Sequence, residues 1–186
     1  MKTEKHKMLG GELYDPFDRQ LSDERRRARL LLKKLNDTCD DQIEARACLI
    51  GELIPHSGKG VWIEPPFYCD YGSNITLGDK VFFNFNCIVL DVARVHIGSR
   101  VLFGPAVQIY AATHPLRAAD RRLGLELGKS VEIGDDAWIG GSAIVCPGVR
   151  IGARSVIGAG SVVTKDIPEG VLAAGNPCRI MREIEP

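Results

Sequence analysis

The sequence predicts a mainly β protein, a three-sided parallel coil of short strands with a helical cap at its N-terminus. Beyond residue 76, apolar residues return every six positions in three blocks: Leu77, Phe83 and Val89; Ile97, Phe103 and Ile109; and Ile133, Ile139, Val145, Ile151, Ile157 and Val163. Earlier in the chain, apolar residues follow the spacing of a helix instead. We therefore expect a helical cap over 1–58 and a coil domain with a C-terminal tail over 59–186.

The period of six fits neither an α-helix nor a simple strand, whose side-chain periods are about 3.6 and 2. Six residues suit one short strand and a tight corner, so three sides form one coil and equivalent positions stack at strand spacing. A small or β-branched residue four positions later is expected to fill each corner, as at Val81, Cys87, Val101, Val107, Thr113, Ala137, Ala143, Val149, Ser155 and Ser161. Glycine often follows the apolar residue, and we expect it to supply the turn's backbone angles.

Two helices are predicted within the cap. Ser22, followed by two acidic residues, is expected to begin the first helix. Its buried face is expected to hold Ala28, Leu31, Leu32 and Leu35, and the second helix, which stops before Pro55, is expected to bury Ile43, Ala47, Ile50 and Leu53. The arginines between 25 and 29 are interpreted as a solvated helix face, with anion binding as the alternative.

The composition is ordinary for a globular protein and gives no indication of a nucleic acid or an anionic membrane as the main partner. The 186 residues are 45% hydrophobic and 26% charged, with a net charge of zero. We find no apolar signal segment and no apolar run of bilayer length. The six cysteines are scattered without a C-x-x-C pair, so we expect reduced thiols in the cytoplasm.

The regular spacing breaks at residues 109–116, which read IYAATHPL. Ile109 is the last apolar residue before the break, and the segment 115–130 is too polar and irregular for a side of the coil. We expect His114 to begin a looped-out segment near 115–130. An excursion from a rigid scaffold is a usual position for functional residues.

Seven segments give the chain a resemblance to a known family. They are GELYDPFD, IEPPFYCDYGSNITLG, FNFNCIVLD, ATHPL, VEIGDDAWIGG, VVTKDIPEGV and AAGNPCRI, in this order. The chain resembles the maltose and galactoside O-acetyltransferases, to which the nodulation acetyltransferases are related, over nearly its whole length. The resemblance implies a left-handed parallel β-helix of hexapeptide repeats. It also implies acetyl transfer from acetyl-CoA to a sugar hydroxyl by a homotrimer whose active sites lie between chains.

On this resemblance, His114 matches the catalytic histidine of the family. A neutral imidazole takes the proton of the hydroxyl as its oxygen attacks the thioester carbonyl, and then returns it to the leaving thiolate. Asn84 matches an asparagine that contacts the acceptor hydroxyl and helps to polarise the reacting centre. The alternative for Asn84 is an interior asparagine that hydrogen-bonds along the stack of coils.

The resemblance also assigns residues to the acceptor sugar. Asp70 lies where the family contacts sugar hydroxyls and favours a maltose-type acceptor, and Asp91 is a second acidic candidate. The galactoside pattern has two successive aspartates at this point, whereas Val92 follows Asp91 in this chain. Galactoside contacts are therefore less favoured. The family's aspartate of the cap aligns with Pro16, and Asp15 or Asp18 on either side of it could serve in its place. Glu126 either orients His114, contacts the acceptor or is a solvated loop residue.

The donor side is expected along the C-terminal coils. Gly104, Trp138, Gly140, Gly141 and Ala159 match the wall along the pantetheine arm of acetyl-CoA, where small residues leave backbone groups accessible. Thr164, Lys165, Arg179 and Arg182 match positions near the nucleotide, where cations suit phosphate groups. The alternative for the small residues is that the tight coil requires them. The alternative for the cations is ordinary surface charge.

Two other functions remain open from the sequence. One is a hexapeptide acetyltransferase for a non-sugar acceptor, such as serine, an amino sugar or an antibiotic. The other is a zinc trimer similar to the γ-class carbonic anhydrases, because His96 and His114 lie one coil apart and could stack. The remaining histidines do not lie in register with this pair, so we expect no metal.

Overall fold

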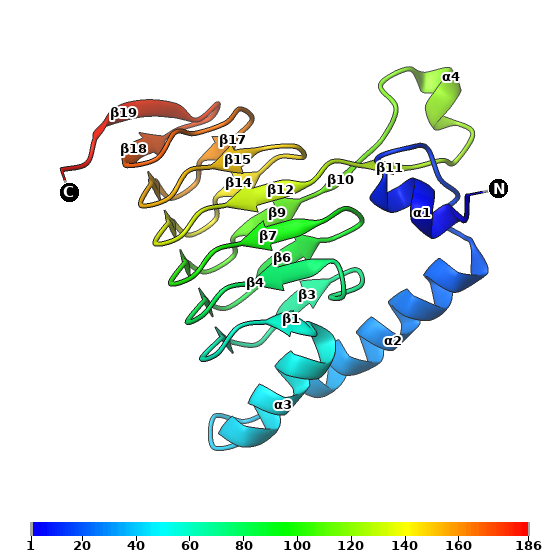
Figure 1. Ribbon diagram of the computed structural model, residues 1–186, viewed down its shortest axis with the longest axis horizontal. Helices are drawn as coiled ribbons and strands as arrows, with labels where there is room; N and C mark the ends of the chain where they lie inside the picture. The colour runs from blue at the N-terminus through cyan, green and yellow to red at the C-terminus, as the bar shows by residue number, and fades with distance from the viewer. Residues whose placement is uncertain (1, 186) are drawn as a thin grey trace.

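The computed structural model describes residues 2–185, which form a triangular coil of short strands with two helices at one end and two beside it (Figure 1). The helices are α1 (Glu4–Leu9), α2 (Arg19–Asn36), α3 (Ile43–Leu53) and α4 (Ala118–Arg121). In Figure 1, α2 and α3 lie at the end of the coil where it begins, and α1 lies beside the excursion that carries α4. No helix within residues 2–185 is long and apolar enough to cross a bilayer.

Three mainly parallel sheets make the sides of the coil in the described part of the chain. The first sheet contains β1 (His56–Ser57), β4 (Ile75–Leu77), β7 (Val95–Ile97), β12 (Val131–Ile133) and β15 (Arg150–Ile151). The second contains β2 (Trp62–Ile63), β5 (Phe82–Phe83), β8 (Leu102–Phe103), β13 (Trp138–Ile139), β16 (Val156–Ile157) and β18 (Val171–Ala174), with β19 (Arg179–Glu183) antiparallel at its edge. The third contains β3 (Phe67–Cys69), β6 (Cys87–Leu90), β9 (Gln108–Tyr110), β14 (Ile144–Val145) and β17 (Val162–Val163).

The predicted period of six is confirmed by the burial and the register of the strands. Every apolar residue of the three blocks is at most 3% exposed. Ile97 pairs with Ile133 across the excursion, and Ile133 pairs with Ile151 in the next coil. Inside the coil, the rings of Phe83 and Phe103 stack with centroids 4.3 Å apart. The column of equivalent apolar side chains is therefore the core of the protein, as expected for a solenoid.

The corners are built differently from the prediction. The left-handed backbone conformation falls three positions after the apolar residue, mostly on non-glycine residues: Lys80, Asn86, Arg100, Ala106, Asp136, Ser142 and Arg154, with φ of 57–63°. The glycines one position after the apolar residue are required for space instead. A Cβ on Gly78 would lie 2.5 Å from the amide nitrogen of Ser99 in the next coil. The expectation that these glycines supply the turn angles was therefore wrong.

The helical cap is confirmed, with two corrections. The Asp18 carboxylate accepts from the Leu21 amide at 3.2 Å and caps α2, so the helix begins before Ser22. The predicted buried face of α2 is confirmed. In α3, however, Ile43 and Ala47 are exposed, and the buried face holds Arg46, Ile50 and Leu53 instead.

Arg46 anchors α3 to the first coil. Its side chain is 1% exposed, and its guanidinium donates to Glu64 at 3.1 Å and to the Thr38 hydroxyl at 3.0 Å. The same guanidinium lies over the Trp62 ring, 5.0 Å from the centroid. A charge taken out of water needs such partners. An apolar pattern could not identify this position because the buried side chain is an arginine.

Candidate active site

The break in the repeat is the excursion that carries His114. The chain leaves the third sheet after β9, forms β10 (Ala112–Thr113), passes through α4 and returns along β11 (Leu127–Gly128). β10 and β11 pair antiparallel, with Thr113 opposite Leu127. His114 follows β10 directly and is exposed. The predicted looped-out segment therefore leaves and rejoins the coil along two hydrogen-bonded strands, and His114 lies at the end of the first.

A pocket of about 420 Å³ lies beside His114. We name it the His114 pocket; it is lined by Tyr14, Pro16, Phe17, Arg25, Arg29, Asp70, Tyr71, Leu90, Val92, Ala112, His114 and Glu126. The lining comes from the cap, from corners of the first two coils and from the excursion. The structure therefore brings together three residues predicted for the site, namely His114, Asp70 and Glu126. Carboxylates beside an imidazole can accept hydrogen bonds from the hydroxyl groups of a ligand.

Glu126 is tied to the cap. The Tyr14 hydroxyl donates to the Glu126 carboxylate at 2.9 Å, and the backbones of the two residues exchange hydrogen bonds of 3.0 and 3.1 Å. Tyr14 is 1% exposed. Burial and the neighbouring Glu126 carboxylate raise the pKa of Tyr14, so its phenol stays protonated and donates. Of the interpretations open for Glu126, the solvated loop residue is the one that this geometry disfavours.

Asp70 is a half-buried carboxylate in the His114 pocket. Burial raises the pKa of Asp70, and the charges of Arg25 and Arg29 oppose this rise. Arg25 itself is held in place, because its guanidinium donates to the Tyr71 hydroxyl at 2.7 Å and to the Pro16 carbonyl. Arg25 therefore departs from the expected solvated face, whereas Arg26, Arg27 and Arg29 are exposed, as that interpretation of the cluster predicts.

Asp91 does not face the pocket. Its carboxylate is 0% exposed and accepts from the amides of Asp70 and Tyr71, each at 2.9 Å, and from the amide of Asn74 at 3.3 Å. Burial raises the pKa of Asp91 to about 7, while the backbone donors act in the opposite direction. The expectation that Asp91 contacts the acceptor is corrected: it fixes the turn that presents Asp70.

Neither candidate aspartate of the cap lines the pocket. The Asp15 carboxylate accepts from the Phe17 amide at 2.8 Å, and the Asp18 carboxylate caps α2. Pro16 and Phe17 line the pocket in their place. Asp15 is exposed and shapes the turn, and the contact predicted for it with the acceptor stays a prediction.

Asn84 and the pantetheine-wall residues lie at a different corner of the coil. Asn84 follows β5, Gly104 follows β8, Gly140 and Gly141 follow β13, and Ala159 follows β16, all between the second and third sheets. Backbone hydrogen bonds of 2.8–2.9 Å run up this corner, from Ala106 to Phe85, from Ser142 to Pro105 and from Gly160 to Gly141. His114 instead lies between the third and first sheets. Within the described part of one chain, His114 and Asn84 therefore lie at two different corners.

The residues predicted for the donor side are small for a structural reason. A Cβ on Gly104 would lie 2.5 Å from the Gly141 amide nitrogen, and one on Gly140 would lie 2.6 Å from the Ala159 amide nitrogen. Trp138 is 53% exposed beside this corner. The wall of backbone and one indole face fits an extended amide-bearing arm. Thr164 and Lys165 follow β17 at the corner of His114, whereas Arg179 and Arg182 lie exposed on β19.

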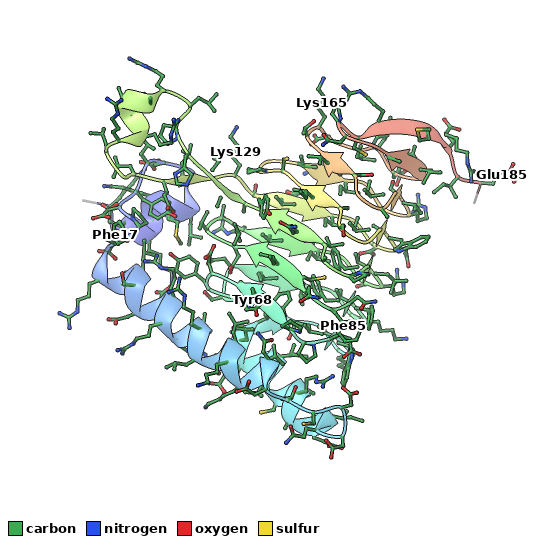
Figure 2. All side chains as sticks on the ribbon, turned by 180° about the vertical axis from the view of Figure 1, so that it is seen from behind. Phe17, Tyr68, Phe85, Lys129, Lys165 and Glu185 are labelled. Atoms are coloured by element: carbon green, nitrogen blue, oxygen red, sulfur yellow. The ribbon has the colours of Figure 1, made fainter. Side chains whose placement is uncertain are left out.

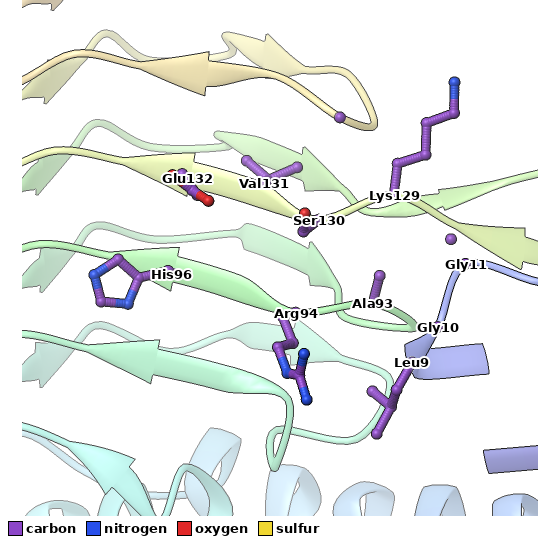
Figure 3. A pocket seen from close by; sticks show the side chains of 12 residues that line it. Leu9, Gly10, Gly11, Ala93, Arg94, His96, Lys129, Ser130, Val131 and Glu132 are labelled. Carbon is purple, nitrogen blue, oxygen red and sulfur yellow. The ribbon is translucent and has the colours of Figure 1, made fainter. Parts of the chain in front are cut away.

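His96 does not stack on His114, which contradicts the alternative that the two histidines share one face. His96 pairs in register with Thr76 and Glu132 on the first sheet, and Figure 3 shows it beside Glu132 on the neighbouring strand. His96 and Glu132 line a second pocket, of about 530 Å³. Figure 3 shows Arg94 and Lys129 extending from this pocket in opposite directions. Within residues 2–185, no three histidine, cysteine or acidic side chains gather as a metal site would require.

Sequence reasoning missed several residues of the pocket. Tyr14, Phe17, Arg25, Arg29 and Tyr71 line it without belonging to any predicted site. Arg25 and Tyr71 are distant in sequence and meet only because the cap folds back over the first coils. No spacing signal marks such a pair.

Comparisons with known proteins agree with this architecture. Residues 7–58 match the family described as the maltose acetyltransferase hexapeptide capping motif, and residues 130–165 match the bacterial transferase hexapeptide repeats. Nodulation protein L of Rhizobium leguminosarum bv. viciae is 50% identical over 179 residues, covering 96% of this chain and 94% of that protein.

Two solved structures extend the likeness to the fold. A maltose O-acetyltransferase from Clostridium difficile 630 superposes with a TM-score of 0.98 at 46% identity, covering 100% of this chain and 99% of that one. A galactoside acetyltransferase in complex with coenzyme A superposes with a TM-score of 0.96 at 39% identity, covering 100% and 92%. The chain belongs to the maltose and galactoside O-acetyltransferase family and is an acetyl-CoA-dependent acetyltransferase of that type.

Proposed function

We propose that the protein transfers acetyl from acetyl-CoA to a hydroxyl group of a sugar, with a maltose or glucose type of acceptor favoured and His114 as the general base. The observation that carries this proposal is the position of His114. It stands where the repeat is interrupted, exposed at the edge of a pocket that also contains Asp70 and Glu126. Oxygen acceptors beside a base suit a ligand that offers several hydroxyl groups.

The imidazole of His114 removes the proton of the acceptor hydroxyl as its oxygen attacks the carbonyl carbon of the thioester. The C–O bond forms, the C–S bond breaks, and the imidazolium returns the proton to the thiolate of coenzyme A. Asp70 and Glu126 accept hydrogen bonds from other hydroxyl groups and orient the ring. Asn84 donates from its amide to the reacting centre. The net reaction consumes no proton and needs no metal.

A homotrimer is proposed from the character of the three faces. The outward residues of the first sheet are polar: His56, Thr76, His96, Glu132 and Arg150. Those of the second are apolar throughout (Trp62, Phe82, Leu102, Trp138, Val156 and Leu172), and those of the third are mostly so (Tyr68, Ile88, Gln108, Ile144 and Val162). Tyr68, Leu102 and Trp138 are each about half exposed, at 49, 48 and 53%. Two apolar faces and one polar face suit three chains around a threefold axis.

The trimer also completes the site. His114 and Asn84 lie at different corners of one chain, so a neighbour has to supply the second half-site. We propose that the His114 pocket of one chain faces the corner with Asn84, Gly104, Gly140, Gly141 and Ala159 of the next. Trp138 would then border the acetyl-CoA groove, with Thr164, Lys165, Arg179 and Arg182 near its nucleotide.

The proposal also covers the location of the protein in the cell and the division of the chain into domains. A cytoplasmic enzyme suits the six cysteines, which are all unpaired thiols among the described residues. The division into a cap over 1–58 and a coil domain over 59–186 is also retained as a proposal. The first strand, β1, already pairs with β4 just before this boundary.

Release of free thiol from acetyl-CoA tests the function. The assay is run with glucose, maltose, galactosides, amino sugars and serine as acceptors. We expect release with glucose or maltose and a loss of at least about a hundredfold in His114→Ala, because a positioned base contributes about that much or more. His96→Ala, an exposed histidine on the polar face, is the matched control and should keep full activity. Release with serine or another non-sugar acceptor alone would contradict the proposal.

A further inference from the structure

Phe17 is an exposed aromatic ring at the His114 pocket. Its side chain is 81% exposed, and the residue contributes to the lining of the pocket. Figure 2 labels it beside α1 and the start of α2, at the end of the molecule opposite Glu185. A ring so exposed adds little to the buried core, because the stabilisation by an apolar side chain follows the area removed from water.

The backbone around this ring is held on every side. The Asp15 amide donates to the Glu4 carboxylate at 2.7 Å, and the Phe17 amide donates to the Asp15 carboxylate at 2.8 Å. Arg25 donates to the Pro16 carbonyl. The turn is thereby fixed while the aromatic ring that it carries remains in solvent. This arrangement is typical of a ring positioned for a ligand rather than for the core.

The His114 pocket changes in character along its lining. His114, Asp70 and Glu126 provide polar groups that can hold hydroxyl groups, whereas Phe17 provides an apolar face at an exposed edge. The C–H face of a pyranose ring or of an aromatic aglycone packs well on such a ring. An acceptor with a single ring can hydrogen-bond to the polar groups alone. An acceptor with a second ring can also pack that ring on Phe17.

We propose that Phe17 determines acceptor specificity, as a platform for the second ring of a disaccharide or aryl glycoside whose first ring is acetylated beside His114. The inference rests on the proposed function and assigns a substrate class to that same pocket. Phe17 contacts the acceptor away from the reacting atoms. Its contribution therefore belongs to binding of the second ring and not to the proton transfer.

The test compares pairs of acceptors that differ by one ring, namely glucose with maltose and methyl with phenyl glucoside. In the full-length Phe17→Ala protein, we expect KM to rise about tenfold for the two-ring acceptors, with kcat unchanged, and both constants to stay the same for the one-ring acceptors. Phe17→Tyr, which keeps the ring, should keep the preference. Ile43→Ala, which removes an apolar side chain of 53% exposure from α3, is the matched control and should change nothing.

The contrary outcomes are distinct. An equal change for one-ring and two-ring acceptors, or no change for either, would overturn the inference and leave the proposed function intact. A loss of the trimeric mass in Phe17→Ala would also overturn it, because the ring would then serve a neighbouring chain. Absence of transfer to any sugar by the unsubstituted protein would overturn the proposed function, and this inference with it.

Discussion

The Tyr14 hydroxyl donates to the Glu126 carboxylate at 2.9 Å and thereby fastens the helical cap to the excursion of the coil. Two backbone hydrogen bonds between the same residues close a short antiparallel bridge around this contact. The two sides of the His114 pocket are therefore one connected unit. A long loop on a rigid scaffold gains a fixed position in this way.

Tyr14→Phe should loosen the excursion without unfolding the coil. The substitution removes one hydrogen bond to a carboxylate, worth about 1.5–3 kcal/mol, and keeps the ring in place. We expect trypsin to cleave several-fold faster after the arginines of the excursion, Arg117, Arg121 and Arg122, as followed by mass spectrometry. Tyr68→Phe changes an exposed tyrosine of the third sheet and serves as the control. Equal cleavage rates in all three proteins would show that the contact does not hold the excursion.

Arg46→Ala should destabilise the cap strongly. Removing the guanidinium leaves the polar groups around it with one partner fewer, which costs about 1–3 kcal/mol for each buried group left unpaired. The half-buried Glu64 carboxylate would lose its guanidinium partner. We expect a clearly lower midpoint of urea unfolding at fixed protein concentration.

Arg27→Ala is the control for that measurement. Arg27 lies on the exposed side of α2 and donates to the Glu52 carbonyl at 3.1 Å. Its removal should change the midpoint little. Equal midpoints for Arg46→Ala and Arg27→Ala would contradict the anchoring role of Arg46.

Asp91 should give the stability a pH dependence. Burial raises its pKa from 3.8 to about 7 in the folded protein, so the folded state binds this proton more tightly than the unfolded chain does. The contribution of Asp91 to the free energy of unfolding should therefore be highest below about pH 4, fall as the pH rises to about 7, and be constant above.

Comparison with Asp91→Asn isolates that contribution. The difference in free energy of unfolding between the two proteins should change by up to about 4 kcal/mol between pH 4 and 7, in the direction that favours the unsubstituted protein at low pH. Asp79→Asn, at an exposed carboxylate, is the control. A difference that is constant over this range would mean that Asp91 does not titrate there.

Much of the fold could be predicted from the sequence because the repeat places one apolar residue on each side of the coil. Ile133, Ile139 and Val145 are buried as the period requires. The face of α3 could not be predicted in the same way. Its buried position at Arg46 is stabilised by Glu64 and Thr38, and these partners are known only once the helix has packed on the coil.

The position of a site residue could be predicted where that residue interrupts the repeat. It could not be predicted where tertiary contacts determine which way the side chain faces. The broken repeat marks the position of His114, whereas its role as a base follows from the family resemblance, and Asp70 and Glu126 lie with it in one pocket. Asp91 differs from Asp70 only in its surroundings, since backbone amides occupy its carboxylate. The turn that holds Phe17 at the pocket depends on Glu4 and Arg25, two residues of different helices.

The most direct test of the shared site is complementation between two inactive variants. His114→Ala and Asn84→Ala should each lose most of their activity alone. If the two residues of one site come from neighbouring chains, trimers that contain both variants should regain about a third of the unsubstituted activity, because one of their three interfaces combines both intact residues. Thiol release with maltose measures the recovery in co-expressed, doubly tagged trimers. Mixed trimers as inactive as the separate variants would contradict the account.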